Sequence, residues 1–325
     1  MKERSNSLDA LKFVLVVLVC LGHLMHNDAF VMNQWEEALY RLLYSFHVST
    51  FAFLSGYLTS TTKSYFKSFI YLYETVVVGN IVWAIINSYS ISWDIFYFSQ
   101  YHLWYLMGLI FWRGLIVICR KYVSINLLLC ISILFYFLIA KLEIWYFGFY
   151  LVFTYFPFFL LGYKMKNCSW IEEKGETKNY SGIKWIAPFL LIYVIYLLVP
   201  NIGSAAHNNG NNGFMWLLAD RFSFIIISPI LVVSCIKLNN YIHWPMFFAK
   251  LGKDSLIYYI YHGFLRTVIV LFFIKNSISM NFIEVLLFLL LIFLFIYLLS
   301  FNKFSYYLLN PISSLIKALR KNSKD

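Results

Sequence analysis

The sequence predicts an all-α polytopic membrane protein, a bundle of about ten transmembrane helices. Its 325 residues are 61% hydrophobic and only 13% charged, whereas soluble domains have about 45–50% apolar and about 25% charged residues. Apolar runs of about 20 residues recur along the whole chain, separated by short polar breaks, which indicates helical spans rather than the alternating strands of a barrel. No stretch is left for a soluble domain, so we predict one transmembrane domain over residues 1–325.

The first apolar run has a basic start like that of a signal peptide, but it lacks an A-x-A-like cleavage site and further spans follow it. We therefore expect it to be an uncleaved membrane helix. The predicted spans lie near residues 8–26, 39–60, 66–88, 102–119, 122–140, 144–164, 184–200, 214–236, 254–274 and 281–301.

The charges alternate between the breaks, and this pattern predicts the orientation. One set of breaks, together with both termini, carries most of the Lys and Arg residues. The other set has little positive charge beyond Arg41, Lys141 and Lys275, and it carries Asp28, Glu36, Glu37 and Asp94. The positive-inside rule places the basic set in the cytoplasm, including the tail 302–325. An even number of spans agrees with two cytoplasmic termini. The net charge of +11 therefore marks a membrane face, and no nucleic-acid partner is expected.

Several site classes find no support in the sequence. The five cysteines are scattered without a CxxC pair, so we expect no disulfide framework and no metal site. The glycine-rich nucleotide motifs, HExxH and GxSxG are also missing, which argues against a soluble nucleotide-binding, protease or hydrolase site.

The first span, "KFVLVVLVCLGH", has Lys12 at one end and His23 at the other. Their separation corresponds to about 16 Å and three helical turns, so both side chains start from nearly the same helix face. Each also has a structural interpretation. Lys12 could snorkel to the membrane surface and pair with Asp9 at i,i+3, and His23 could be a hydrogen-bonded packing residue.

Ionisable residues at membrane depth are costly and are therefore candidates for function. Together they predict a polar cavity with an inner and an outer end. The inner set is Lys12, Glu74 and Lys253, and the set at mid-depth or in the outer half is His23, His47, His102, Arg221 and His262. Trp104 and Tyr105 follow His102 and could equally be aromatic residues of the membrane interface, while Ser55 and Gly56 suit close helix packing.

Four segments resemble, in order and spacing, the signature segments of the acyltransferase family 3 integral membrane proteins. They are "LDALKFVLVVLVCLGH", "FHVSTFAFLSGYL", "HLWYL" and "LGKDSLIYYIYH". The resemblance covers essentially the whole chain. Within the family, the sequence is similar to the branch of fucose 4-O-acetylase-like sugar O-acyltransferases. It implies transfer of an acyl group, usually acetyl from cytoplasmic acetyl-CoA, to a hydroxyl of an extracytoplasmic sugar in the bacterial cytoplasmic membrane.

The resemblance also implies roles for particular residues. Its R/K-x10-H pair falls on Lys12 and His23, with Lys12 standing where many members have Arg, and the "FHVST" segment lacks a common proline. Candidate catalytic residues are His23, His47, His102 and His262; candidate coenzyme-binding residues are Lys12, Arg4 and Lys253; candidate substrate-binding residues are Arg221, Trp104 and Tyr259. We expect His23 to be the general base, with an acyl-histidine relay as the open alternative.

A transporter or flippase for a lipid-linked saccharide or a proton-coupled solute is the alternative function, because buried His and Arg residues also suit proton relays. The expected partners are acyl-CoA, a sugar or polysaccharide acceptor, the lipid bilayer and proteins that assemble cell-envelope polysaccharide. The sequence identifies neither the acceptor sugar nor whether the donor carries acetyl, succinyl or another short acyl group.

Overall fold

The computed structural model describes residues 5–59, 65–97, 101–139, 148–168, 171, 182–199, 214–301 and 304–315. Helices dominate these ranges, and no β-strand occurs within them apart from the isolated bridge between Phe30 and Met280. The all-α prediction is therefore confirmed for the described part of the chain.

A helix occupies each of the predicted spans. The helices are α1 (Asn6–Met25), α2 (Gln34–Leu58), α3 (Tyr65–Ile86), α4 (Trp104–Cys119), α5 (Ile125–Leu138), α6 (Phe149–Lys164), α7 (Ala187–Leu198), α8 (Phe214–Tyr241), α10 (Ser255–Lys275) and α11 (Phe282–Ser300). Among the described residues, five helices are long and apolar enough to cross a membrane, namely α1, α3, α8, α10 and α11. The larger number of crossings stays a prediction.

Side-chain caps explain where several helices begin. Ser5 caps α1 by accepting a hydrogen bond from the Leu8 amide. At α2, Asn33 and Glu36 form a capping box, which satisfies backbone groups at the helix end and starts the helix before the predicted residue 39. Asn281 and Glu284 form the same motif at the start of α11.

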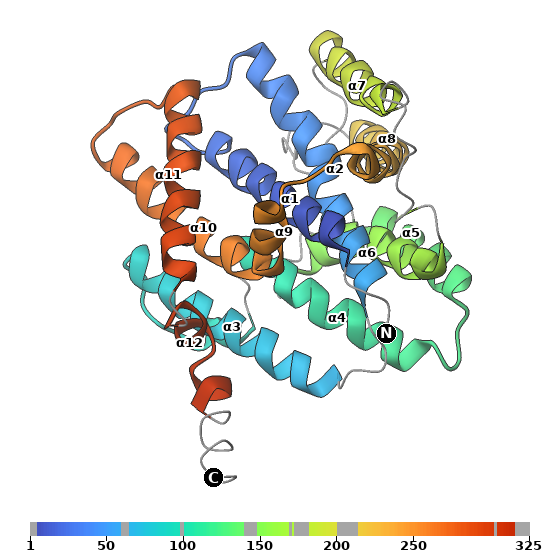
Figure 1. Ribbon diagram of the computed structural model, residues 1–325, viewed down its shortest axis with the longest axis horizontal. Coiled ribbons are helices and arrows are strands. Elements are labelled where there is room, and N and C mark those ends of the chain that lie inside the picture. Colours follow the sequence, from blue (N-terminus) through green and yellow to red (C-terminus); the bar gives the residue numbers. More distant parts are fainter. Residues whose placement is uncertain are drawn as a thin grey trace.

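The helix α1 lies in the middle of the bundle with α2 beside it, α10 packs against α1 and α11, and α7 lies at the edge (Figure 1). Two glycines let α2 and α6 touch along their backbones. A Cβ atom on Gly56 would overlap the Phe159 carbonyl oxygen, and one on Gly162 would overlap the Phe53 carbonyl oxygen. The packing role predicted for Gly56 is therefore confirmed, since only small residues permit such a close approach.

Two short helices were not predicted from the sequence. The first, α9 (Met246–Lys253), packs against the start of α1, where Gly252 leaves room for the Asp9 backbone. The second, α12 (Phe304–Leu309), lies against α3 (Figure 1). After α12 the chain is anchored by Glu74, whose carboxylate accepts hydrogen bonds from the amides of Ile312 and Ser313 and from the Ser313 hydroxyl. Glu74 thus holds the C-terminal segment to α3 and does not join an inner polar cavity.

Candidate active site

Three of the predicted histidines lie together; we call His23, His102 and His262 the histidine cluster. The ring of His23 stacks on that of His262 with a centroid distance of 5.6 Å and an interplanar angle of 12°. His102 lies 5.3 Å from His262. They come from three separate parts of the sequence, α1, the turn before α4, and α10, and both His102 and His262 are fully buried.

Two glycines beside these histidines make room for the cluster. A Cβ atom on Gly263 would fall within the imidazole of His102, so only glycine permits this position of the ring. A Cβ atom on Gly22 would lie 2.9 Å from Cε2 of Tyr44. Each glycine is adjacent in sequence to a clustered histidine, and each admits a side chain from another helix.

Hydrogen bonds fix the imidazoles in place. His102 Nε2 lies 3.0 Å from the Ile260 carbonyl oxygen, and His262 Nδ1 lies 3.1 Å from that of Tyr258. Carbonyl oxygens only accept, so these nitrogens are the donors, and a neutral imidazole then keeps a lone pair on its other nitrogen. For His262 that nitrogen is Nε2, which has no hydrogen-bond partner among the described residues.

His23 has a different partner, the hydroxyl of Tyr44, at 3.3 Å from its Nδ1. The fourth predicted histidine, His47, lies beyond Tyr44, with its ring 4.9 Å from the tyrosine ring. His47 Nδ1 is bound to the Leu43 carbonyl oxygen of its own helix. Tyr44 therefore connects His47 to the cluster, and its role was not predicted from the sequence.

Arg266 ties the helices of the cluster together. Its Nε donates to the His23 carbonyl oxygen at 3.0 Å, and its Nη2 donates to that of His26 at 2.5 Å. These carbonyls belong to the last turn of α1, where a helix has no partners of its own for them and where a positive charge is favourable. Arg266 lies one turn beyond His262 on α10, so it links the helix that carries His262 to the end of the helix that carries His23.

A cavity of about 590 Å³ lies between α1, α2, α3, α4 and α10. Three cationic residues line it, Lys12, Lys67 and Arg113, and none of the lining residues that the structure describes is acidic. Tyr105 and Arg113 line it from the same helix, eight residues apart, which corresponds to about 12 Å along α4. Arg113 and Tyr105 thus mark two separate parts of the cavity wall, which we call its cationic end and its aromatic end.

The three cations differ in their partners. The ammonium of Lys12 lies 2.7 Å from the carboxylate of the buried Asp9, so Asp9 balances its charge. Lys67 and Arg113 supply the uncompensated positive charge of the cavity, since no described acidic residue pairs with either. The sequence carried a signal for Arg113, a single Arg within the apolar run "GLIFWRGLIVIC", but neither residue was predicted to bind a ligand.

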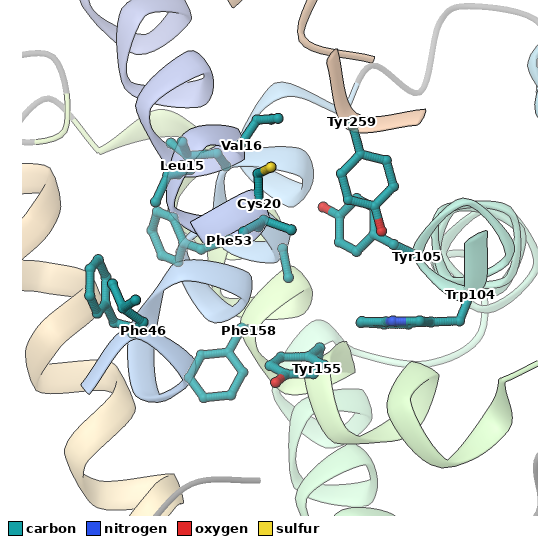
Figure 2. Close-up of a cluster of buried hydrophobic side chains, with 14 of the residues drawn as sticks. Leu15, Val16, Cys20, Phe46, Phe53, Trp104, Tyr105, Tyr155, Phe158 and Tyr259 are labelled. Atoms are coloured by element: carbon teal, nitrogen blue, oxygen red, sulfur yellow. The ribbon is translucent and has the colours of Figure 1, made fainter. Parts of the chain in front are cut away.

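Three of the residues that line the cavity carry aromatic rings that pack together around Tyr105; we call Phe51, Tyr105 and Tyr259 the aromatic layer. The ring centroids are 5.3 Å apart for Phe51 and Tyr105, 5.5 Å for Tyr105 and Tyr259, and 6.3 Å for Phe51 and Tyr259. Figure 2 shows the rings of Tyr105 and Tyr259 side by side.

Tyr259 also reaches the histidine cluster. Its ring lies 5.8 Å from His102 and 5.6 Å from His262, and its hydroxyl donates to the His102 carbonyl oxygen. The predicted site residue Tyr259 thus stands between the cavity and the histidines.

Other predicted site residues lie apart from this arrangement. Arg221 donates to the Tyr136 carbonyl oxygen at 2.6 Å, and its guanidinium lies over the rings of Tyr136 and Tyr150. Lys253 is exposed at the end of α9 and does not line the cavity. Arg4 lies outside the described residues.

Trp104 is inside the bundle, where its ring stacks on Tyr155 at a centroid distance of 5.4 Å. Trp104 and Tyr105 are both buried. The interpretation of these two residues as aromatic residues of the membrane interface is therefore wrong.

Residues 5–301 match a family model described as an acyltransferase domain, acyltransferase 3. Neither the comparison with curated proteins nor the one with solved structures gives a match. The matched range includes the histidine cluster, the cavity and the aromatic layer.

Proposed function

The chain belongs to the acyltransferase 3 family, and from this premise we propose that it is a membrane O-acetyltransferase. The proposed reaction moves an acetyl group from cytoplasmic acetyl-CoA to a hydroxyl of an extracytoplasmic or lipid-linked sugar. Because the branch of sugar O-acyltransferases related to fucose 4-O-acetylase has similar signature segments, we place the protein in that branch. The proposed location is the bacterial cytoplasmic membrane, with both termini in the cytoplasm, as the distribution of Lys and Arg favours.

The cavity is the observation that carries the proposal. Coenzyme A is a phosphorylated nucleotide on a flexible arm, and the cationic end of the cavity offers Lys67 and Arg113 without an acidic neighbour in its lining. Arginine binds phosphate through two parallel hydrogen bonds, whereas lysine acts as a point charge. In the proposed orientation this end faces the cytoplasm, which is where the coenzyme is supplied. Lys12, which is paired with Asp9, then has a smaller part in coenzyme binding than the sequence led us to expect.

The other end of the cavity leads toward the candidate catalytic groups. In the proposed complex the coenzyme arm extends from Arg113 toward the aromatic layer, so that the thioester approaches Tyr259. Behind Tyr259 lie His102 and His262, and His23 stacks on His262. The acyl group therefore has to pass the ring of Tyr259 before it meets the histidine that we propose as the base.

In the proposed reaction, neutral His23 takes the proton from the acceptor hydroxyl as the oxygen attacks the thioester carbonyl carbon. The C–O bond of the ester forms, the C–S bond breaks, and the proton passes to the coenzyme thiolate. For His23 Nε2 to act as the base, its Nδ1–H must donate to the Tyr44 hydroxyl oxygen, and the 3.3 Å separation is compatible with that tautomer. His102 and His262 would polarise or orient the reacting groups.

The acceptor would reach the histidines from the opposite side of the membrane. A sugar hydroxyl on a polysaccharide or on a lipid-linked intermediate fits the proposed direction of transfer, and envelope polysaccharide assembly proteins are the proposed partners. His23 and Arg266 lie near the end of α1 that would face outward.

Labelled acetyl-CoA provides the test. Inverted membrane vesicles containing the protein should incorporate the acetyl label into saccharide when acetyl-CoA is added outside, since their exposed face is the former cytoplasmic face. Vesicles with the His23→Ala variant are the matched control and should incorporate no label above background. Uptake of saccharide by the vesicles without cleavage of the thioester would contradict the proposal and favour a carrier.

A further inference from the structure

The aromatic layer has no role in the chemistry proposed above, yet its three rings line the cavity and one of them, Tyr259, also contacts His102 and His262. Phe51, Tyr105 and Tyr259 come from three different helices, α2, α4 and α10, and each ring lies within 6.3 Å of the other two. All three residues line the cavity. An acyl group that travels from the cavity toward His262 meets these rings.

Two of the three rings are held firmly. Tyr105 packs against Trp112 at 5.6 Å, and its hydroxyl lies 2.8 Å from that of Ser55. Tyr259 is fixed by the hydrogen bond from its hydroxyl to the His102 carbonyl. Both residues are almost fully buried. Moving either ring costs packing contacts and a hydrogen bond.

Phe51 is different, because it has no polar anchor and is only partly buried. It lies on the same helix as Ser55, one turn away, and packs its ring against the edges of Tyr105 and toward Tyr259. The space at this end of the cavity is therefore set most directly by the size of the side chain at position 51.

We propose that the aromatic layer is a size filter for the acyl group, which admits acetyl and excludes longer chains, and that Phe51 sets the limit. This inference rests on the proposed acyl-CoA donor and adds to it the residues that limit the length of the acyl group. The filter lies at the only part of the described cavity lining where three rings meet, so chain length is sensed there and not at the cationic end.

The physical basis is that the interior does not expand to accept extra volume without strain. One methylene group beyond what an apolar site accommodates changes discrimination by about 10- to 200-fold. We therefore expect kcat/KM to fall by at least about tenfold for each methylene beyond the limit. The coenzyme part of every donor is the same, so its binding at Lys67 and Arg113 should change little along the series.

The experiment uses the full-length protein in detergent, with the saccharide fraction of the source membranes as acceptor and acetyl-, propionyl-, butyryl- and hexanoyl-CoA as donors. Release of the free coenzyme thiol gives the rate. The variant Phe51→Ala should shift the profile toward longer chains, and Phe51→Leu should give an intermediate profile. Leu58→Ala is the matched control, because it enlarges the cavity from the same helix about 10 Å away and should leave the dependence on chain length unchanged.

Each outcome is decisive. A wild-type protein that uses hexanoyl-CoA as well as acetyl-CoA overturns the size filter while supporting the acyl-CoA donor. A Phe51→Leu variant that folds but keeps the wild-type profile also overturns it, even if Phe51→Ala is unstable. If the protein cleaves none of the four donors, that result contradicts the proposed function itself.

Discussion

The Nε of Arg266 lies 3.0 Å from the carbonyl oxygen of His23, so a side chain of α10 fixes the end of the helix that carries the proposed base. Hydrogen bonds from charged donors contribute about 1.5–3 kcal/mol each. We expect Arg266→Met to lower kcat about tenfold or more while leaving KM for acetyl-CoA nearly unchanged. Arg266→Lys should restore part of the loss, because an ammonium keeps the charge without the planar fork.

The double variant with His23→Ala separates positioning from general stabilisation. If Arg266 acts through His23, then Arg266→Met should cause no further loss of activity in the His23→Ala background. Multiplicative losses in the double variant would show that the two residues act independently.

Replacing Gly263 should disturb the histidine cluster without adding or removing a polar group. Because a Cβ atom at this position overlaps the His102 ring, we expect Gly263→Ala to displace the imidazole and lower both activity and the midpoint of thermal unfolding in detergent. Val268→Ala is the control on the same helix, since Val268 is exposed on the outside of the bundle. Wild-type activity of Gly263→Ala would mean that the position of His102 does not matter for the reaction.

Tyr44→Phe tests the tautomer of His23. The change removes the hydroxyl that lies 3.3 Å from Nδ1 and leaves the ring in place. Since general base catalysis depends on the orientation of the imidazole, we expect kcat to fall about tenfold, a part of the 10²–10⁴-fold that a base contributes. Tyr73→Phe, which removes a hydroxyl bound to the distant Phe96 carbonyl, should leave kcat unchanged. Equal effects of the two substitutions on kcat would contradict the role of the Tyr44 hydroxyl in fixing the tautomer of His23.

Charge reversal at the cationic end of the cavity should weaken donor binding. For Lys67→Glu and Arg113→Glu we expect a higher KM for acetyl-CoA with a smaller change in kcat, because the phosphates lie far from the reacting carbon. The effect should be larger at low salt, where exposed charges are less screened. The same substitution at Lys253, which does not line the cavity, serves as the control. An unchanged KM in both cavity variants would contradict the assignment of this end to the coenzyme.

Glu74 should matter for stability and not for the chemical step. Its carboxylate accepts hydrogen bonds from the segment after α12, and removing it takes the shared partner from three partly buried donors, at a cost of about 1 kcal/mol each. We expect Glu74→Ala to lower the midpoint of thermal unfolding and to expose the C-terminal segment to protease. Unchanged unfolding and protease resistance would show that the anchor contributes little.

The helical fold followed from hydrophobicity, and the shared face of Lys12 and His23 followed from their spacing on one helix. Long apolar runs determine helices because backbone groups in lipid must bond within the segment. The meeting of His23, His102 and His262 could only be guessed from similar depths, since the packing of separate helices decides it. The pairs Arg266–His23 and Glu74–Ser313 join residues more than 200 positions apart, and no local pattern indicates them.

The cationic residues show a different limit. Lys12 and Lys253 were selected because both lie within signature segments on the predicted cytoplasmic side, yet Lys12 is paired with Asp9 and Lys253 lies away from the cavity. Arg113 was overlooked, although an arginine within an apolar helix is expensive unless it has a partner or a water-filled space. The sequence shows that Arg113 lies within an apolar run. It does not show the cavity beside Arg113, because that depends on how five helices pack together.

The most direct test of the account is the release of free coenzyme thiol from acetyl-CoA by the purified protein, with membrane saccharide as acceptor, compared between the wild type and His23→Ala. We predict release by the wild type that depends on the acceptor. For His23→Ala we predict a rate lower by about 10²- to 10⁴-fold with binding of acetyl-CoA retained. Release of the coenzyme thiol at the wild-type rate by His23→Ala would contradict the role of His23 as the base. No release of the thiol by the wild type would contradict the proposed acetyl transfer.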